Sequence, residues 1–186
     1  MLTRNIVRKF SGFKKAVLPE LNYDYNGLSP IISGDILEVH HGKHHQTYVN
    51  NFNNLLPQVE EAVANGDANK LAILSNGLKF NAGGHINHSI YWSNLASKNK
   101  EGGDLPCPTS ELSKLMNATF GSYEEFFKAF NAKTVAIQGS GWGWLAYKKE
   151  TGVLSIQETQ NQVILTELGY VPLLGKSFFN VDKNSY

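Results

Sequence analysis

Histidine is the residue type whose placement in this chain most strongly suggests chemistry. All six histidines lie in two short clusters: His40, His41, His44 and His45, then His85 and His88. If the first cluster is helical, residues four apart share a face and form two stacked pairs. Neutral imidazole is a common ligand for borderline metals, and ligands from two helices can converge on one ion. The clusters therefore predict a metal site between two helices. The alternative is that most of these histidines lie on the surface or only support such a site.

Other kinds of site match the sequence poorly. The run from Gly139 to Trp144 superficially resembles a phosphate-binding loop, but no helix pattern follows it, and tryptophans replace the small residues such a turn needs. Cys107 is the single cysteine, so an intrachain disulfide is excluded, and we interpret it as a loop residue without chemistry. A hydrolytic metal site would need carboxylates close to the histidines, and the two clusters contain none.

Two helical regions must position the histidine clusters. Ser29-Pro30 is typical of a helix start, and apolar spacing from Ile31 predicts a helix that continues towards Leu56, with a bend or interruption at Pro57. Residues 69–77 and about 81–95 suggest two further helices, the second of which begins after or within Asn-Ala-Gly-Gly. The last of these helices, if it lies beside the first, could bring His85 and His88 to meet the first cluster.

The second half of the chain changes character. Residues 98–108 contain paired glycines and two prolines and are the best candidate for a domain boundary. Helices are predicted at 109–117 and 122–134, with strands at 142–147 and 153–157 joined by a turn. This order indicates an α+β protein with an all-helical N-terminal part.

Charge is unevenly distributed along the chain. The first 19 residues contain five basic residues, and the first acidic residue is Glu20. Apolar residues lie between these cations, which is typical of a mitochondrial transit peptide over residues 1–17; the alternative is a disordered basic tail. The other residues hold 12 of the 17 basic side chains against 16 acidic ones, which disfavours nucleic-acid binding. No run approaches the roughly 18 apolar residues of a membrane span.

Four ordered motifs resemble those of the iron/manganese superoxide dismutases. The first runs from His40 through Tyr48, the second from Leu78 to Trp92, the third from Val135 to Trp144, and the fourth is Asn161-Gln162. The resemblance covers about Leu18 to Gly175. It implies an N-terminal helical hairpin domain over 18–100 and a C-terminal α/β domain with a small antiparallel sheet over 109–175.

The resemblance also implies an active site. In this family one redox metal, bound by three histidines, one aspartate and a solvent molecule, oxidises one superoxide and reduces a second. The positions that match are metal ligands His40 and His88; entrance residues Tyr48 and His44; apolar wall residues Trp92, Trp142 and Trp144; and Gln162, which hydrogen-bonds the metal-bound solvent. As ligands of one ion on two antiparallel helices, His40 and His88 should have ring nitrogens within about 5 Å of each other. Gly84 stands where iron-type relatives place that glutamine, so the resemblance favours manganese over iron. It further implies a homodimer or homotetramer, and with the leader it suggests the mitochondrial matrix.

The sequence departs from the family pattern after Gly175. In register, Ser177 stands where the aspartate ligand belongs and Val181 where the last histidine ligand belongs. We therefore interpret 176–186 as a divergent tail and the C-terminal domain as incomplete, and we expect one face of the sheet to lose its cover. Two functions stay open: a superoxide dismutase, or an inactive or weakly metal-binding truncated isoform.

Overall fold

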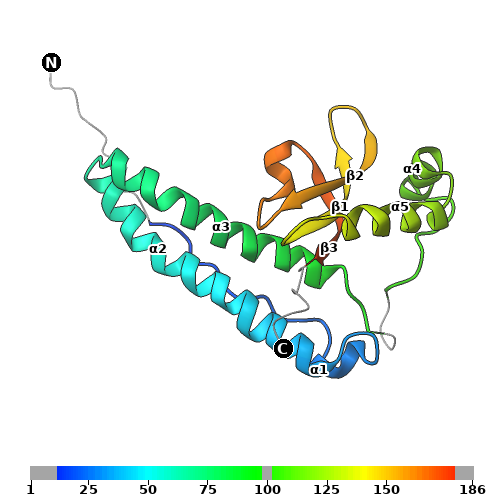
Figure 1. Ribbon diagram of the computed structural model, residues 1–186, viewed down its shortest axis with the longest axis horizontal. Coiled ribbons are helices and arrows are strands. Elements are labelled where there is room, and N and C mark those ends of the chain that lie inside the picture. The colour runs from blue at the N-terminus through cyan, green and yellow to red at the C-terminus, as the bar shows by residue number, and fades with distance from the viewer. Residues whose placement is uncertain (1–11, 98–101, 179–186) are drawn as a thin grey trace, which may run out of the picture.

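The computed structural model describes residues 12–97 and 102–178 and has an α+β architecture, as predicted (Figure 1). Its elements in chain order are η1 (Tyr25–Leu28), α1 (Gly34–Glu38), the π-helical η2 (Val39–His45), α2 (Gln46–Ala64), α3 (Ala68–Ser93), α4 (Glu111–Phe120), α5 (Tyr123–Val135), β1 (Gly141–Lys148), β2 (Val153–Gln160), η3 (Leu165–Leu168) and β3 (Val171–Phe178). The long helices α2 and α3 form an antiparallel hairpin, and the small sheet lies beside the C-terminal part of α3 (Figure 1). None of the helices in the described ranges has both the length and the apolar character needed to cross a membrane.

The first long helix begins later than predicted and passes through its proline. Ser33, and not Ser29, caps α1, with its side chain accepting from the Ile36 amide. Pro57 lies inside α2, which continues to Ala64 without interruption. The residues around it keep one face of α2 buried, so packing against α3 outweighs the local cost of the proline.

The second half of the hairpin is one helix, so the prediction of two separate helices was wrong. Asp67 caps α3 by accepting from the Lys70 amide at 2.9 Å, and the helix runs unbroken through the paired glycines. The paired glycines, Gly83 and Gly84, leave room for neighbouring groups that a side chain would displace. A side chain at Gly83 would meet the Gln162 carbonyl, and one at Gly84 would meet the Tyr48 ring. They let α3 approach its neighbours closely.

Three antiparallel strands form the sheet in the order β2-β1-β3. The residue pattern predicted β1 and a shorter β2. It did not predict β3, because this strand contains Pro172 and Gly175, which both disfavour strands. The central strand is covered on both sides. Trp144 and Ala146 pack towards α3 and η3, while Leu145 packs with residues of α4 and α5. The expected loss of cover on one face is therefore not seen at β1, within the described part of the chain.

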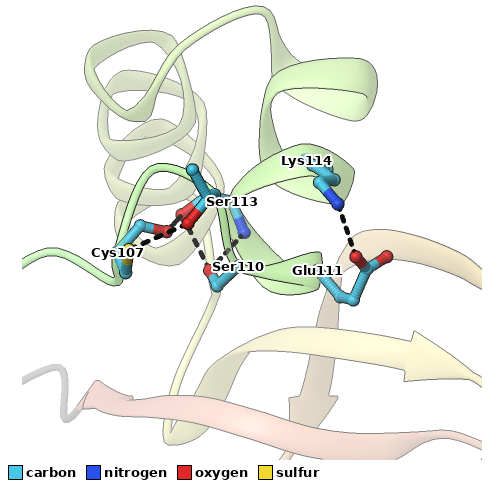
Figure 2. Close-up of polar contacts among 6 residues, drawn as sticks. Cys107, Ser110, Glu111, Ser113 and Lys114 are labelled. Carbon is cyan, nitrogen blue, oxygen red and sulfur yellow. Dashed lines mark hydrogen bonds and ion pairs between the residues drawn. The ribbon is translucent and has the colours of Figure 1, made fainter.

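Side-chain hydrogen bonds tie the linker between the halves to α4 (Figure 2). The Ser113 hydroxyl donates to the Cys107 carbonyl at 2.8 Å, and Ser110 caps the helix by accepting from the Ser113 amide at 3.2 Å. Glu111 and Lys114 form an exposed ion pair on the same turn. Ser122 caps α5 as predicted.

Candidate metal centre

The structure brings His40 and His88 together. His40 lies on η2 and His88 on α3, and their Nε2 atoms are 3.0 Å apart. The other ring nitrogen of His88, Nδ1, lies 2.7 Å from the Gly84 carbonyl, which can only accept. Nδ1 therefore carries the proton, and the Nε2 lone pair of His88 points to His40. The expectation that the rings approach within about 5 Å is confirmed; their role as ligands stays a prediction.

Both imidazoles are held neutral by burial. Desolvation is the main reason that the pKa of His40 falls to about 4 and that of His88 to about 3, and neighbouring histidines lower both pKa values further. Only the neutral ring has a lone pair for a metal. At neutral pH these two groups are therefore ready to bind a cation without first losing a proton.

Gln162 connects the sheet side of the site to the hairpin. Its Oε1 accepts from the Trp142 indole N–H at 3.2 Å, which fixes the orientation of the amide. Its Nε2 then donates to the Tyr48 hydroxyl at 3.2 Å. The Tyr48 ring lies 5.2 Å from the His88 ring, and burial raises the pKa of Tyr48. The Tyr48 hydroxyl oxygen accepts from Gln162, so its own proton is directed elsewhere.

Aromatic rings surround the histidine pair. Trp92 lies 4.9 Å from the His40 ring and Trp142 lies 5.0 Å from the His88 ring, both nearly edge-on. Trp144 lies one layer farther out: it stacks on Trp142, and its indole N–H donates to Thr159. His44 is exposed, with its ring 6.2 Å from His40. All of the site residues expected from the sequence thus gather in one region.

Two other histidines support the site, a role that the sequence left open as the alternative for most of the six. Trp92 donates its indole N–H to His45 Nδ1 at 2.9 Å, so His45 Nε2 must donate to His85 Nδ1, also at 2.9 Å. Burial lowers the pKa of both rings, that of His45 to about 3. The sequence feature that could have indicated this role is the clustering of the histidines, because His45 and His85 come from the same two clusters as the proposed ligands.

A third histidine anchors the segment that precedes the hairpin. His41 Nε2 lies 2.9 Å from the Pro19 carbonyl and must donate to it, so its Nδ1 accepts from the Tyr25 hydroxyl at 3.1 Å. This fixes the chain before α1 against the π-helical turn. Both ring nitrogens of His41 are therefore committed to this support.

The remaining side of the site carries no third metal-binding side chain in the described ranges. Ser177 pairs with Trp142 across β1 and β3, and opposed residues share a sheet face, so Ser177 lies on the face that meets His88. Its hydroxyl is a poor ligand. Residues 12–97 and 102–178 hold no cluster of three or more His, Cys, Asp or Glu suited to a metal. Val181 lies outside the described residues. The described donors fit one side of a metal ion and do not complete its coordination.

Comparisons with known proteins agree with this geometry. Residues 15–96 match the α-hairpin domain of the iron/manganese superoxide dismutases, and residues 108–181 match the C-terminal domain of that family. The chain is 49% identical over 175 residues to a mitochondrial manganese superoxide dismutase of Glossina morsitans morsitans, covering 92% of this chain and 78% of that protein. It is 49% identical over 154 residues to an iron superoxide dismutase of Tetrahymena pyriformis, covering 83% and 79%. A manganese superoxide dismutase of Chlamydia muridarum is 47% identical over 167 residues, covering 89% and 79%.

The chain belongs to the iron/manganese superoxide dismutase family. As a member of this family of oxidoreductases it has superoxide as its substrate class and a redox metal, manganese or iron, as its cofactor class. The family match to 181 includes Ser177, so the serine occupies a position within the domain.

Proposed function

We propose that this protein is a manganese-type superoxide dismutase of the mitochondrial matrix, with His40 and His88 as metal ligands. The observation that carries the proposal is the 3.0 Å approach of their Nε2 atoms between two helices. Two imidazole nitrogens at that separation suit one ion with metal–nitrogen distances of roughly 2 Å. The relatives that are named mitochondrial manganese enzymes support the metal and the compartment.

The bound metal would supply one-electron chemistry, and the protein's own residues would control protons and access. Gln162 presents an amide N–H whose orientation Trp142 fixes, and Tyr48 accepts from it. This arrangement suits a hydrogen-bond chain that holds a proton at Tyr48 Oη. The aromatic wall of Trp92 and Trp142 excludes water from the far side of the imidazoles.

The position of the glutamine supports manganese over iron. Gly84 has no room for a side chain because the Tyr48 ring fills the space, so a glutamine could not be placed there without displacing Tyr48. Gln162 approaches from the other domain instead. A glutamine from the C-terminal domain is the arrangement that the family resemblance associates with manganese. Reconstitution with each metal in turn would test this preference.

A second candidate function is a weakly metal-binding or inactive isoform, and Ser177 favours it. With serine in place of the anionic ligand, a cation would be held by neutral donors alone, which lowers affinity and removes charge compensation.

We also expect a homodimer or homotetramer for the first candidate, the superoxide dismutase. The molar mass of the protein in solution would test this.

One experiment separates the candidates. The full chain is purified after growth with manganese, and manganese per chain and the superoxide dismutation rate are measured for the wild type and Ser177→Asp. A dismutase carries about one ion per chain, with activity proportional to manganese. The weak-binding candidate carries far less, and Ser177→Asp raises both values. Asn117→Asp, at an exposed position of α4, is the control for added charge. Activity that does not follow manganese content in any variant would contradict both candidates.

A further inference from the structure

Gln162 lies in a turn that directly follows β2. The Asn161 amide donates to the Ser140 carbonyl at 2.7 Å, so the pairing with the β1 side continues one residue beyond the strand. The Val163 amide then donates to the Gln160 carbonyl at 3.1 Å, which closes a β-turn with Asn161 and Gln162 at its two central positions. The direction in which the Gln162 side chain leaves the sheet is therefore set within this turn.

Asn161 has a backbone conformation that no other non-glycine residue of 12–97 and 102–178 shares. Its φ angle is 51°, in the left-handed region, where the Cβ of an L-residue crowds the following carbonyl oxygen. Among non-glycine residues asparagine is enriched several-fold in this region, whereas β-branched residues are outliers there. The turn therefore requires at position 161 a residue that accepts a positive φ.

The side chain of Asn161 does not itself contact the metal centre. It is exposed, and within the described part of the chain it takes part in no hydrogen bond. Any effect of Asn161 on the site is therefore transmitted through the backbone to Gln162.

The backbone that follows Asn161 is packed closely against α3. A side chain at Gly83 would meet the carbonyl oxygen of Gln162. One helical turn later, the buried Asn87 donates its Nδ2 hydrogen to the Val163 carbonyl at 3.3 Å. These contacts leave the turn little room to shift, so a change in chain direction at 161 must be taken up by Gln162.

The Gln162 amide has to satisfy two partners at once. Its Oε1 accepts from the Trp142 indole and its Nε2 donates to the Tyr48 hydroxyl, each at 3.2 Å. Gln162 is buried, so a partner that is lost is not replaced cheaply by water. A rotation of the chain at 161 would move the amide away from both partners.

We propose that Asn161 is a positioning residue for the dismutase reaction, because its left-handed backbone conformation directs the Gln162 amide to Trp142 and Tyr48. The link to the reaction rests on the proposed function, but the position of the amide can be measured without metal. Substitutions at 161 should be tolerated in the order in which residues accept a positive φ. Glycine should preserve the amide position, alanine should disturb it and valine should disturb it most.

The indole N–H signals in proton–nitrogen NMR spectra of the full chain without added metal test this order. Three tryptophans give three such signals, and Trp142→Phe assigns the one that matters. The Trp142 signal should keep its wild-type position in Asn161→Gly. It should move upfield in Asn161→Ala and farther in Asn161→Val, because the indole loses its acceptor. Gln160→Val is the matched control: it puts the same side chain at the exposed strand position just before and should leave the signal in place.

The Trp92 signal shows whether each variant is folded, because this indole donates to His45 within the hairpin. An unmoved Trp142 signal in Asn161→Ala and Asn161→Val would overturn the proposal. A shift in Asn161→Gly as large as that in Asn161→Val would also overturn it, since the asparagine side chain would then be responsible. If Asn161→Val does not fold, the comparison of Asn161→Ala with Asn161→Gly decides.

The dismutation rate per bound manganese connects the amide position to the reaction. We expect a loss of about tenfold or more in Asn161→Val and a rate close to that of the wild type in Asn161→Gly. A moved Trp142 signal with an unchanged rate would contradict a positioning role. A manganese-loaded wild type without activity would contradict the proposed function instead, and the NMR order would still decide whether Asn161 positions the amide.

Discussion

Gly84 serves the site through both its backbone and its missing side chain. Its carbonyl accepts from His88 Nδ1, which turns the Nε2 lone pair towards His40, and its lack of a Cβ leaves room for the Tyr48 ring. Both effects act on neighbours of the same imidazole. A single residue with no functional group therefore sets the tautomer of one proposed ligand and the position of the hydroxyl beside it.

Gly84→Ala should displace the Tyr48 ring and lower the free energy of unfolding by about 1–3 kcal/mol, as expected for overpacking. Gly77→Ala in the same helix is the matched control. A Cβ there meets Leu55 at an ordinary 3.5 Å, and alanine favours a helix over glycine by roughly 0.5–1 kcal/mol. Urea denaturation of both variants checks this. The prediction fails if Gly84→Ala is as stable as Gly77→Ala.

The buried histidines should make the metal-free protein sensitive to acid. The pKa values of His40, His45 and His88 are lowered to about 4, 3 and 3, mainly by burial, so below the unfolded value of 6.5 the unfolded chain binds more protons. The free energy of unfolding therefore keeps its full value above about pH 6.5. It falls as the pH drops from there towards 4, by up to about 1.4 kcal/mol per pH unit for each ring. Urea midpoints from pH 7 to 5 measure the slope, which should be smaller in His45→Gln. A flat profile would contradict the burial of neutral imidazoles.

At the scale of elements, the outer edge of β3 is held by the end of α3. Asn94 accepts from the Gly175 amide at 2.9 Å and donates to the Leu173 carbonyl at 3.4 Å, in place of a further strand. Through this contact α3, which carries His88, positions the strand that carries Ser177. Edge strands need such cover, since their free backbone groups otherwise pair with other chains.

Asn94→Ala should therefore destabilise the protein by about 1–2 kcal/mol and increase amide exchange at Gly175. Asn131→Ala is the control, because Asn131 only accepts an exposed hydrogen bond from Lys176 and its loss should change stability by less than about 0.5 kcal/mol. Hydrogen exchange read at Gly175 would decide. Equal protection in Asn94→Ala and the wild type would show that β1 alone holds the strand.

Local sequence rules predicted the elements that depend on local chemistry and failed where tertiary contacts decide. Ser122 was recognised as a cap because capping needs only its own hydroxyl and the next turn. Gly83 and Gly84 suggested a helix start, but their purpose is to let Gln162 and Tyr48 approach. Pro57 suggested a break, and burial of α2 overrode it. The π-helical turn at Val39–His45 carries no sequence signal that distinguishes it from an α-helix.

At the scale of the whole molecule, the site lies where two independently patterned halves meet. His40 and His88 come from the helical hairpin, whereas Trp142, Gln162 and Ser177 come from the sheet domain. The sequence motifs indicated which residues belong together but not which face of β3 Ser177 occupies. The face that Ser177 occupies depends on how β1 pairs with β3, and this pairing joins residues that are far apart in the sequence.

Titration of the metal-free full chain with Mn²⁺ tests the central claim most directly, with the EPR signal of the free ion reporting how much is bound. We expect one class of site, weakened by about tenfold or more in His40→Asn and in His88→Asn. The loss of binding free energy in the double variant should be smaller than the sum of the two single losses, because both rings serve one ion. His44→Asn is the matched control from the same cluster and should bind nearly as the wild type does. Wild-type binding by His40→Asn or His88→Asn, or independent losses that add in the double variant, would contradict a shared metal site.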